Sequence, residues 1–112
     1  MQQKDTVASY FYMHDAEKKS FARSLQQKMV SNPAMYGINQ DGNNTIKITV
    51  TLVKEGSPLA ITATLNGKPS ASLLKEAQAW IATLGVSPKD LQMSKEPAKN
   101  SALVADFDVN YT

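Results

Sequence analysis

The chain contains no cysteine among its 112 residues and only one histidine. Disulfide bonds, zinc–thiolate centres and thiol catalysis are therefore excluded. The excess of one sign of charge over the other is also small: 12 basic and 10 acidic residues give a formal net charge of +2. Nucleic-acid-binding proteins carry a concentrated basic surface, so this composition gives no support for that class of partner.

The sequence also lacks a long hydrophobic run. No stretch approaches the ~20 apolar residues of a membrane-spanning helix, and no signal-peptide core is recognisable. Two explanations stay open: a cytoplasmic protein, or the soluble piece of a longer protein whose targeting segment lies outside this sequence. The chain does hold 42% hydrophobic residues in a length typical of one domain. We therefore expect a single domain with a hydrophobic core.

The N-terminal part predicts an amphipathic helix that begins near His14. Phe21, Leu25 and Met29 recur at i, i+4 and i+8 and form one apolar stripe. Pro33 is expected to end this helix, because the residue before a proline disfavours the helical region. The apolar segment Val7–Met13 either forms a separate strand or continues the helix upstream, and we favour one long helix.

The stretch TIKITVTLVKEGSPLAITATLNG, from Thr45 to Gly67, alternates apolar and polar residues on both sides of a turn. Alternation of this kind predicts two antiparallel strands joined as a β-hairpin. The turn is expected at residues 54–57, where Gly56 supplies turn chemistry. The predicted core face consists of Ile46, Ile48, Val50 and Leu52 on the first strand and of Leu59, Ile61, Ala63 and Leu65 on the second.

The C-terminal half predicts a second helix. Its apolar stripe consists of Leu74, Ala77, Ile81 and Leu84. Either Ser70 or Ser72 can cap its start, and Gly85 stands where a helix-ending glycine belongs.

Two more strands follow this helix in the prediction. Leu91 and Met93 alternate with polar residues and predict a short strand. The last strand is expected to turn Leu103, Ala105, Phe107, Val109 and Tyr111 toward the core. Aspartate in place of Leu103 or Ile48 is therefore expected to unfold the domain, because it would place a charge on the core face.

The predicted order of elements is helix, strand, strand, helix, strand, strand. We therefore expect an α+β fold, a two-layer sandwich of αββαββ type in which two helices cover one face of a four-stranded antiparallel sheet. Such a sheet has two edge strands, and exposed edges are templates for pairing with another chain. This edge is the clearest physical indication of a function, and it favours an interaction module.

Few residues are placed for catalysis or metal binding. His14 is followed by Asp15, yet adjacent helical residues do not face each other, and a solvent-facing histidine is the simplest interpretation. Asp106 and Asp108 project from the same face of the last predicted strand. Exposure to solvent is favoured over a cation site, which usually needs more oxygen ligands from a loop. We predict no catalytic residue, no metal, no cofactor and no enzymatic activity.

Three further groups of residues have both a functional and a structural interpretation. Trp80 and Phe107 could stack on a ligand, but their positions on apolar stripes favour the core. The hairpin threonines are expected to form an ordinary solvated sheet face. The only group of neighbouring basic residues is expected to lie on a solvated helix face. The threonines are Thr49, Thr51, Thr62 and Thr64, and the basic residues are Lys18, Lys19 and Arg23, balanced by Asp15 and Glu17.

The run SLLKEAQAWIATLGVSPKDLQMSKEPAKNSALVADFDVNY, from Ser72 to Tyr111, reads as a helix, a Gly-Val break, a strand, a turn and a strongly alternating strand. It resembles the circularly permuted ferredoxin-like periplasmic domains of inner-membrane assembly-platform proteins of bacterial type II secretion and type IV pili, of the M/L and PilO/PilN kinds. The first half of the chain matches that family in the order of its elements only. The resemblance implies a scaffold protein without catalytic residues, held to the membrane by a segment absent from this chain.

The same resemblance implies a division of the chain and a class of partner. Residues 1–20 would be the end of a lead-in helix segment, and residues 21–112 would form a single α+β domain. The implied partners are proteins, in a homodimer or a heterodimer with a related platform protein, at the periplasmic face of the bacterial inner membrane. Without the resemblance, a cytoplasmic location is expected.

Other functions stay open. The main alternative is a small free-standing cytoplasmic or phage-type inhibitor or regulator that binds a protein partner. A cystatin-like arrangement of one long helix against four strands is a further alternative, although the first hairpin has no Gln-x-Val-x-Gly motif, which makes protease inhibition a poor interpretation. An enzyme with a small-molecule pocket comes last.

Overall fold

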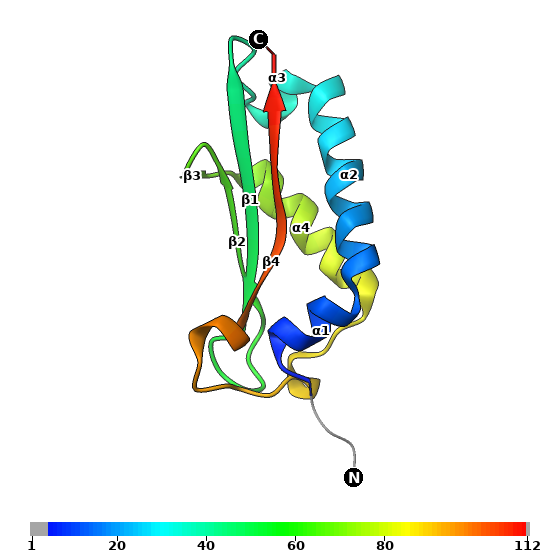
Figure 1. Ribbon diagram of the computed structural model, residues 1–112, viewed down its shortest axis with the longest axis vertical. Helices are drawn as coiled ribbons and strands as arrows, with labels where there is room; N and C mark the ends of the chain where they lie inside the picture. The colour runs from blue at the N-terminus through cyan, green and yellow to red at the C-terminus, as the bar shows by residue number, and fades with distance from the viewer. Residues whose placement is uncertain (1–4, 112) are drawn as a thin grey trace.

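The computed structural model describes residues 5–111 as a long sheet with helices on one side (Figure 1). Within those residues, no helix has the length and apolarity needed to cross a bilayer. The helices are α1 (Val7–Met13), α2 (Asp15–Ser31), α3 (Pro33–Tyr36) and α4 (Ala71–Leu84), followed by the 3-10 turns η1 (Pro88–Asp90) and η2 (Pro97–Lys99). The strands are β1 (Asn43–Thr51), β2 (Ala60–Leu65), β3 (Lys68–Pro69) and β4 (Ser101–Asn110).

The sheet is built around β1. Its strand order is β3-β2-β1-β4, and every pairing is antiparallel. β1 pairs with β2 between Ile46–Leu65 and Thr51–Ala60, and it pairs with β4 along its whole length. The predicted class is therefore confirmed: an α+β fold in which helices pack on a four-stranded antiparallel sheet.

The fourth strand lies elsewhere than predicted. It is β3, joined to β2 by Asn66 and Gly67, which both adopt positive φ angles of 54° and 81°. An Asn-Gly pair in this conformation makes a tight two-residue hairpin turn. β3 precedes α4, so the order of elements departs from αββαββ.

The predicted strand at Leu91–Met93 is wrong. After α4, Pro88 begins the turn η1, and the following residues bond to the N-terminal segment instead of the sheet. Leu91 forms an isolated parallel bridge with Asp5, and the Gln92 N–H donates to the Asp5 carbonyl at 2.7 Å. Leu91 is nevertheless buried in the core, which explains why its neighbourhood alternates like a strand.

The core lies between the helices and the inner face of the sheet. Ile46, Ile48 and Val50 of β1 are fully buried, as the alternation predicts. Leu73 occupies the buried position predicted for Leu74, which is only half-buried. The helices contribute Phe21, Leu25 and Met29 from α2 and Leu73, Ala77 and Ile81 from α4.

A β-bulge in β4 reverses the predicted alternation for the residues that precede Ala105. The register with β1 shifts between the pairs Ile48–Ala105 and Thr49–Leu103, which leaves Val104 as the extra residue. Val104 and Ala105 are consecutive buried residues, and Leu103 is 45% exposed. The prediction that Leu103 faces the core is therefore wrong, whereas Ala105 and Val109 lie inside as expected.

The N-terminal helical region is divided at His14. Val7–Met13 is helical, but His14 leaves the helical region with φ −107° and ψ 36°, so α1 and α2 are separate helices. Figure 1 shows α1 turned away from the axis of α2. The expectation of one long helix therefore fails at this residue. The expected boundary between residues 20 and 21 falls inside α2, and residues 1–4 lie outside the described part of the chain.

Asn44 is the buried polar residue that holds one end of the sheet together. Its side chain is fully buried, and its Oδ1 accepts from the Asn39 backbone N–H at 2.8 Å and from Asn66 Nδ2 at 3.2 Å. Its Nδ2 donates to the carbonyls of Asn39 and Val109. One amide thus connects the loop before β1, the β2–β3 turn and β4.

The bulge leads to a prediction that separates neighbouring residues of β4. Val104→Asp and Ile48→Asp should abolish cooperative thermal unfolding, because each puts a charge in the core. Leu103→Asp should change the free energy of unfolding by no more than about 0.5 kcal/mol, as is usual at an exposed position. Circular-dichroism melting of the three variants measures this. A folded Val104→Asp beside an unfolded Leu103→Asp would contradict the bulge.

The Asn44 amide generates a second prediction. Asn44→Ala should lower the free energy of unfolding by at least about 2 kcal/mol, because leaving a buried polar group unsatisfied costs about 1–3 kcal/mol. Asn43→Ala is the matched control, since Asn43 precedes it in β1 and is exposed. Urea denaturation measures both variants. Equal stabilities would show that Asn44 does not hold this end of the sheet.

A candidate binding groove between two helices

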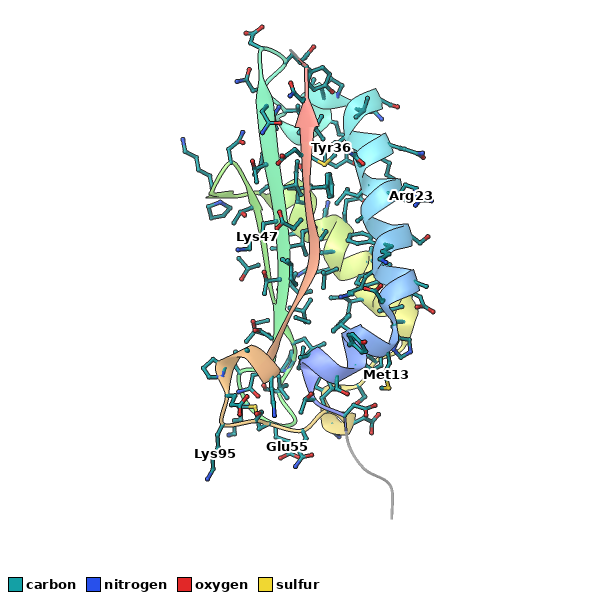
Figure 2. The ribbon with its side chains drawn as sticks, in the orientation of Figure 1. Met13, Arg23, Tyr36, Lys47, Glu55 and Lys95 are labelled. Atoms are coloured by element: carbon teal, nitrogen blue, oxygen red, sulfur yellow. The ribbon has the colours of Figure 1, made fainter. Side chains whose placement is uncertain are left out.

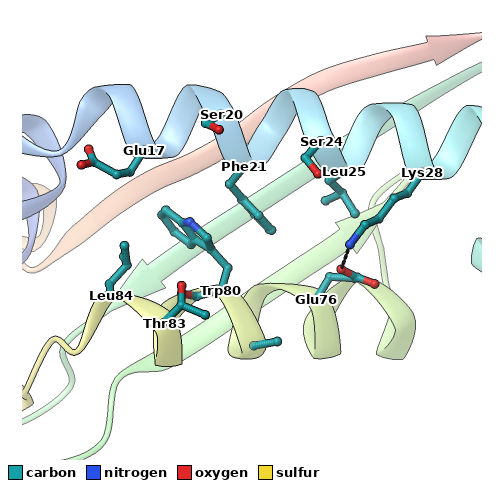
Figure 3. Close-up of a pocket in the computed structure, with 11 residues that line it drawn as sticks. Glu17, Ser20, Phe21, Ser24, Leu25, Lys28, Glu76, Trp80, Thr83 and Leu84 are labelled. Carbon is teal, nitrogen blue, oxygen red and sulfur yellow. Dashed lines mark hydrogen bonds and ion pairs between the residues drawn. The ribbon is translucent and has the colours of Figure 1, made fainter.

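The two long helices lie over different strands and leave a groove between them. α2 packs against β4, whereas α4 packs against β2 and β1. The groove between α2 and α4 has a volume of about 450 Å³. We call it the α2–α4 groove, and Figure 3 shows the residues that line it.

An aromatic pair joins the two helices across the floor of this groove. The rings of Phe21 and Trp80 are stacked, with centroids 4.7 Å apart and planes inclined by 13°. Leu25 and Leu84 extend the apolar floor on either side. Phe21 is buried, but Trp80, the only tryptophan of the chain, keeps part of its surface exposed. The floor is therefore an apolar surface that another molecule can reach.

Small residues form the walls of the α2–α4 groove. Ser20 and Ser24 line it from α2, and Ala79 and Thr83 line it from α4. All four are exposed, and each pair is spaced by four residues, which places both members on one flank of their helix. Because these side chains are short, the groove is open along its length instead of being closed by bulky side chains.

Charged residues mark the two ends of the groove (Figure 3). At one end, Lys28 Nζ forms an ion pair with Glu76 Oε2 at 3.3 Å, and the Tyr36 hydroxyl donates to Glu76 Oε1 at 3.1 Å. At the other end, near Leu84, Glu17 is exposed and has no ion-pair partner within residues 5–111. The groove therefore has one neutralised end and one negative end.

Burial of Tyr36 raises the pKa of its phenol, and the neighbouring Glu76 carboxylate raises it further. Both causes oppose the phenolate, since burial disfavours any charge and a carboxylate repels a second anion. Tyr36 therefore remains a hydrogen-bond donor that holds Glu76 in place beside Lys28.

His14 is not the solvent-facing residue that we expected. It lies at the break between α1 and α2, where it is half-buried. Its ring stacks on Tyr10 at 4.2 Å, and its Nδ1 lies 2.8 Å from the Tyr10 carbonyl oxygen. Asp15 turns to the lysines instead: its carboxylate pairs with Lys19 at 3.1 Å, and this hydrogen bond lowers the pKa of Asp15. The structure therefore does not bring His14 and Asp15 together as a reactive pair.

The two aspartates and the hairpin threonines lie on the outer face of the sheet, whereas Phe107 is on the inner face. Asp106 and Asp108 are exposed, and Asp106 lies opposite Lys47 of β1. No cluster of three or more potential metal-ligating residues is found between residues 5 and 111. Thr49 and Thr62 are directly opposed on the same outer face. Phe107 is half-buried against the core and lies outside the α2–α4 groove.

The edge of β4 is less open than a free edge strand would be. Lys18 Nζ donates to the Leu103 carbonyl at 3.4 Å, and Gln26 Nε2 donates to the Asp108 carbonyl at 3.0 Å. Both donors come from α2, which lies beside this strand (Figure 2). The sheet edge, which the sequence indicates as an interaction surface, is therefore partly occupied by the chain's own side chains.

The sequence does not reveal the α2–α4 groove. It predicts that Phe21 and Trp80 lie on helical apolar faces, which is correct for each helix taken alone. These apolar faces line a groove only because α2 and α4 lie apart on the sheet. The four-residue spacing of Ser20 with Ser24 and of Ala79 with Thr83 was a visible but weak signal.

The Tyr36–Glu76 contact can be tested by alkaline titration. Glu76→Gln should lower the pKa of one tyrosine, because the repelling carboxylate is gone. The wild-type pKa is raised on folding, so stability from this group is present below about pH 10 and is lost as the pH rises through the folded pKa. Ultraviolet absorbance of the phenolate follows the titration, and Tyr36→Phe identifies the tyrosine concerned. An unchanged titration in Glu76→Gln would contradict the contact.

Comparison of the chain with protein-family models, with curated proteins and with solved structures finds no match.

Proposed function

We propose that this domain is a non-enzymatic interaction module that binds another protein chain in the α2–α4 groove. The observation that carries the proposal is the stacked Phe21–Trp80 pair, an apolar floor with part of Trp80 exposed between two helices. Tryptophan is enriched among the residues that dominate binding energy at protein interfaces. An amphipathic helix laid in an apolar groove is a recurring mode of recognition.

The length of the groove suits a helix. Its α2 wall extends from Glu17 to Lys28, which corresponds to about 17 Å, or three helical turns. The exposed walls are short side chains that leave room for the backbone of another helix to approach. A partner helix of three turns would cover the floor and place polar groups near Glu17 and Lys28 at the two ends.

The finer proposal is a scaffold role in a bacterial pilus or secretion assembly platform at the periplasmic face of the inner membrane. Its support is the resemblance of Ser72–Tyr111 to that family. The α2–α4 groove is equally compatible with a free-standing inhibitor or regulator, because both functions act through contact with a protein. Photo-crosslinking tests the protein binding that both functions share.

Site-specific photo-crosslinking in the cells that naturally make the protein tests the proposed function. A photoreactive benzoylphenylalanine at Ser24 should give a covalent protein adduct of discrete mass, because Ser24 lines the groove. The same group at Thr62, exposed on the outer face of the sheet, is the matched control and should give much less adduct. Adding Thr83→Arg, which fills the opposite wall, should abolish the Ser24 adduct. No protein adduct at Ser24, or equal adducts at both positions, would overturn the proposal.

A further inference from the structure

We propose that Asn66 is a site of spontaneous deamidation that the folded β2–β3 turn keeps unreactive, and that reaction there detaches β3 from the sheet. Asparagine is among the thermolabile residues of proteins, and Asn66 is the only asparagine of this chain that glycine follows. Glycine has no side chain to shield its backbone nitrogen, and its backbone rotates freely. The Asn66–Gly67 step is therefore the one best suited to attack by a backbone nitrogen on a side-chain amide. This proposal does not depend on what the α2–α4 groove binds.

The reaction consumes only water. The Gly67 backbone nitrogen loses its proton and attacks Cγ of Asn66, so a new N–Cγ bond forms and the Cγ–Nδ2 bond breaks. The amide nitrogen leaves with a proton as ammonia, and a succinimide ring remains. Water then opens the ring at one of its two carbonyl carbons and gives either aspartate or isoaspartate. No oxidant or reductant takes part.

The Gly67 nitrogen is accessible in the folded chain. Asn66 and Gly67 are both exposed, and no atom lies within 4 Å of the position that a Gly67 Cβ would occupy. Within residues 5–111, the Gly67 N–H donates no hydrogen bond to the backbone outside the strands or to a side chain. The attacking atom is therefore not blocked by the rest of the protein, and protection must come from the conformation of the turn.

The backbone of the folded turn holds the two reacting atoms apart. Asn66 has a φ angle of 54°, which lies in the left-handed helical region, where ψ is about +47°. At such a ψ angle the nitrogen of the following residue lies opposite Cβ across the Cα–C bond. Closure of the ring needs this nitrogen on the same side as Cβ, so Gly67 cannot reach Cγ of Asn66 until the turn opens.

Both ends of the Asn66 side-chain amide are held as well. Its Oδ1 accepts from the Thr45 backbone N–H at 2.9 Å, and its Nδ2 donates to Asn44 Oδ1 at 3.2 Å. Asn44 is fully buried and is itself fixed by the Asn39 and Val109 backbone. Rotation of Cγ toward Gly67 breaks the two bonds of Asn66, so the Asn44 amide helps to keep Asn66 in an unreactive geometry.

Either product removes the contacts that prevented the reaction. An ionised aspartate has no donor, so it cannot donate to Asn44 Oδ1, and two oxygen atoms then face each other without a proton between them. Isoaspartate instead adds a methylene group to the main chain, which changes the length of a two-residue turn that fixes the strand register. Because hydrolysis releases ammonia into solution, the turn does not return to its original state.

Loss of the turn reaches the start of α4. β3 is only two residues long and pairs with β2. The next residue, Ser70, donates its backbone N–H to the Ala63 carbonyl at 3.0 Å, and its Oγ accepts from the Leu73 N–H as the N-cap of α4. Deamidation of Asn66 therefore detaches β3 and loosens the first turn of α4, whereas the long pairing of β1 with β4 stays intact.

The first experiment compares rates of deamidation in the purified full chain at mildly alkaline pH, with and without urea. Peptide mass spectrometry detects the mass gained when –OH replaces –NH2 and assigns it to a residue. Asn66 should react at least about tenfold more slowly in the native chain than in urea, because the native turn must first open. Equal rates in the two conditions, or no reaction of Asn66 in urea, would overturn the proposal.

Two destabilising variants separate local opening of the turn from global unfolding. Asn44→Ala removes the acceptor of Asn66 Nδ2 and should speed deamidation of Asn66 about tenfold in the absence of urea. Leu91→Ala is the matched control, because Leu91 is a core residue beside Asp5 and does not contact the turn. It should change the rate by less than about twofold. Both variants are compared under conditions in which circular dichroism shows them folded, and an equal acceleration by Leu91→Ala would contradict protection by the turn.

Asn66→Asp then reproduces one product directly. It should lower the equilibrium constant for folding about tenfold, whereas Asn43→Asp, the same charge change at an exposed position of β1, should leave it unchanged. Hydrogen exchange followed by NMR should show the Ser70 and Leu73 amides exchanging at least about tenfold faster in Asn66→Asp. Unchanged stability together with unchanged exchange would show that reaction at Asn66 does not release this part of the sheet.

Discussion

Burial of the inner face of β1 is the constraint on which the rest of this structure depends. Ile46, Ile48 and Val50 are completely removed from solvent, and each fully buried side chain of this kind contributes about 1.5–3 kcal/mol. β1 is also the strand with a long partner on both sides. The two helices and the flanking strands therefore take their positions from it, and the sheet cannot form in another register without exposing this face.

The α2–α4 groove follows from how the helices share that face. α2 lies over β4 and α4 lies over β2 and β1, so side chains rather than direct helix–helix packing must fill the space between them. Phe21 and Trp80 are large enough to meet across it, while the serines, alanine and threonine above them are not. The protein thus completes its core and forms a surface depression with the same two aromatic residues.

The parts of the fold that could be predicted from the sequence are those controlled by a periodic pattern. The alternation in β1 and the stripe of Phe21, Leu25 and Met29 both correspond to buried faces. The bulge at Val104 could not be predicted, because residues 102–105 are all apolar, so a change in which of them face the core leaves no mark in the sequence. The wrong prediction of a strand at Leu91–Met93 has a different cause. Leu91 is buried in the core and its backbone bridges to Asp5, and a burial pattern does not reveal which segment a backbone pairs with.

The α2–α4 groove lies at the limit of such prediction. Residue patterns show which side of a helix is apolar, but they do not fix the distance between two helices on a sheet. The Asn66-Gly67 turn was a local signal strong enough to place β3, since both residues adopt the positive φ angles that such a turn needs. The break at His14 has no comparable signal, because Phe11 and Phe21 are ten residues apart, a separation that is compatible with one continuous helix.

The two edge strands of the sheet, β4 and β3, affect how the protein behaves in solution. On one border, α2 occupies backbone carbonyls of β4 through Lys18 and Gln26. On the other, the outermost strand is only two residues long and ends in Pro69, which cannot donate a backbone hydrogen bond. Strands that are charged, short or interrupted by proline resist the ribbon-to-ribbon stacking that begins fibre growth. These features oppose edge-to-edge pairing of the sheet at the carbonyls of Leu103 and Asp108 and at the two-residue strand β3.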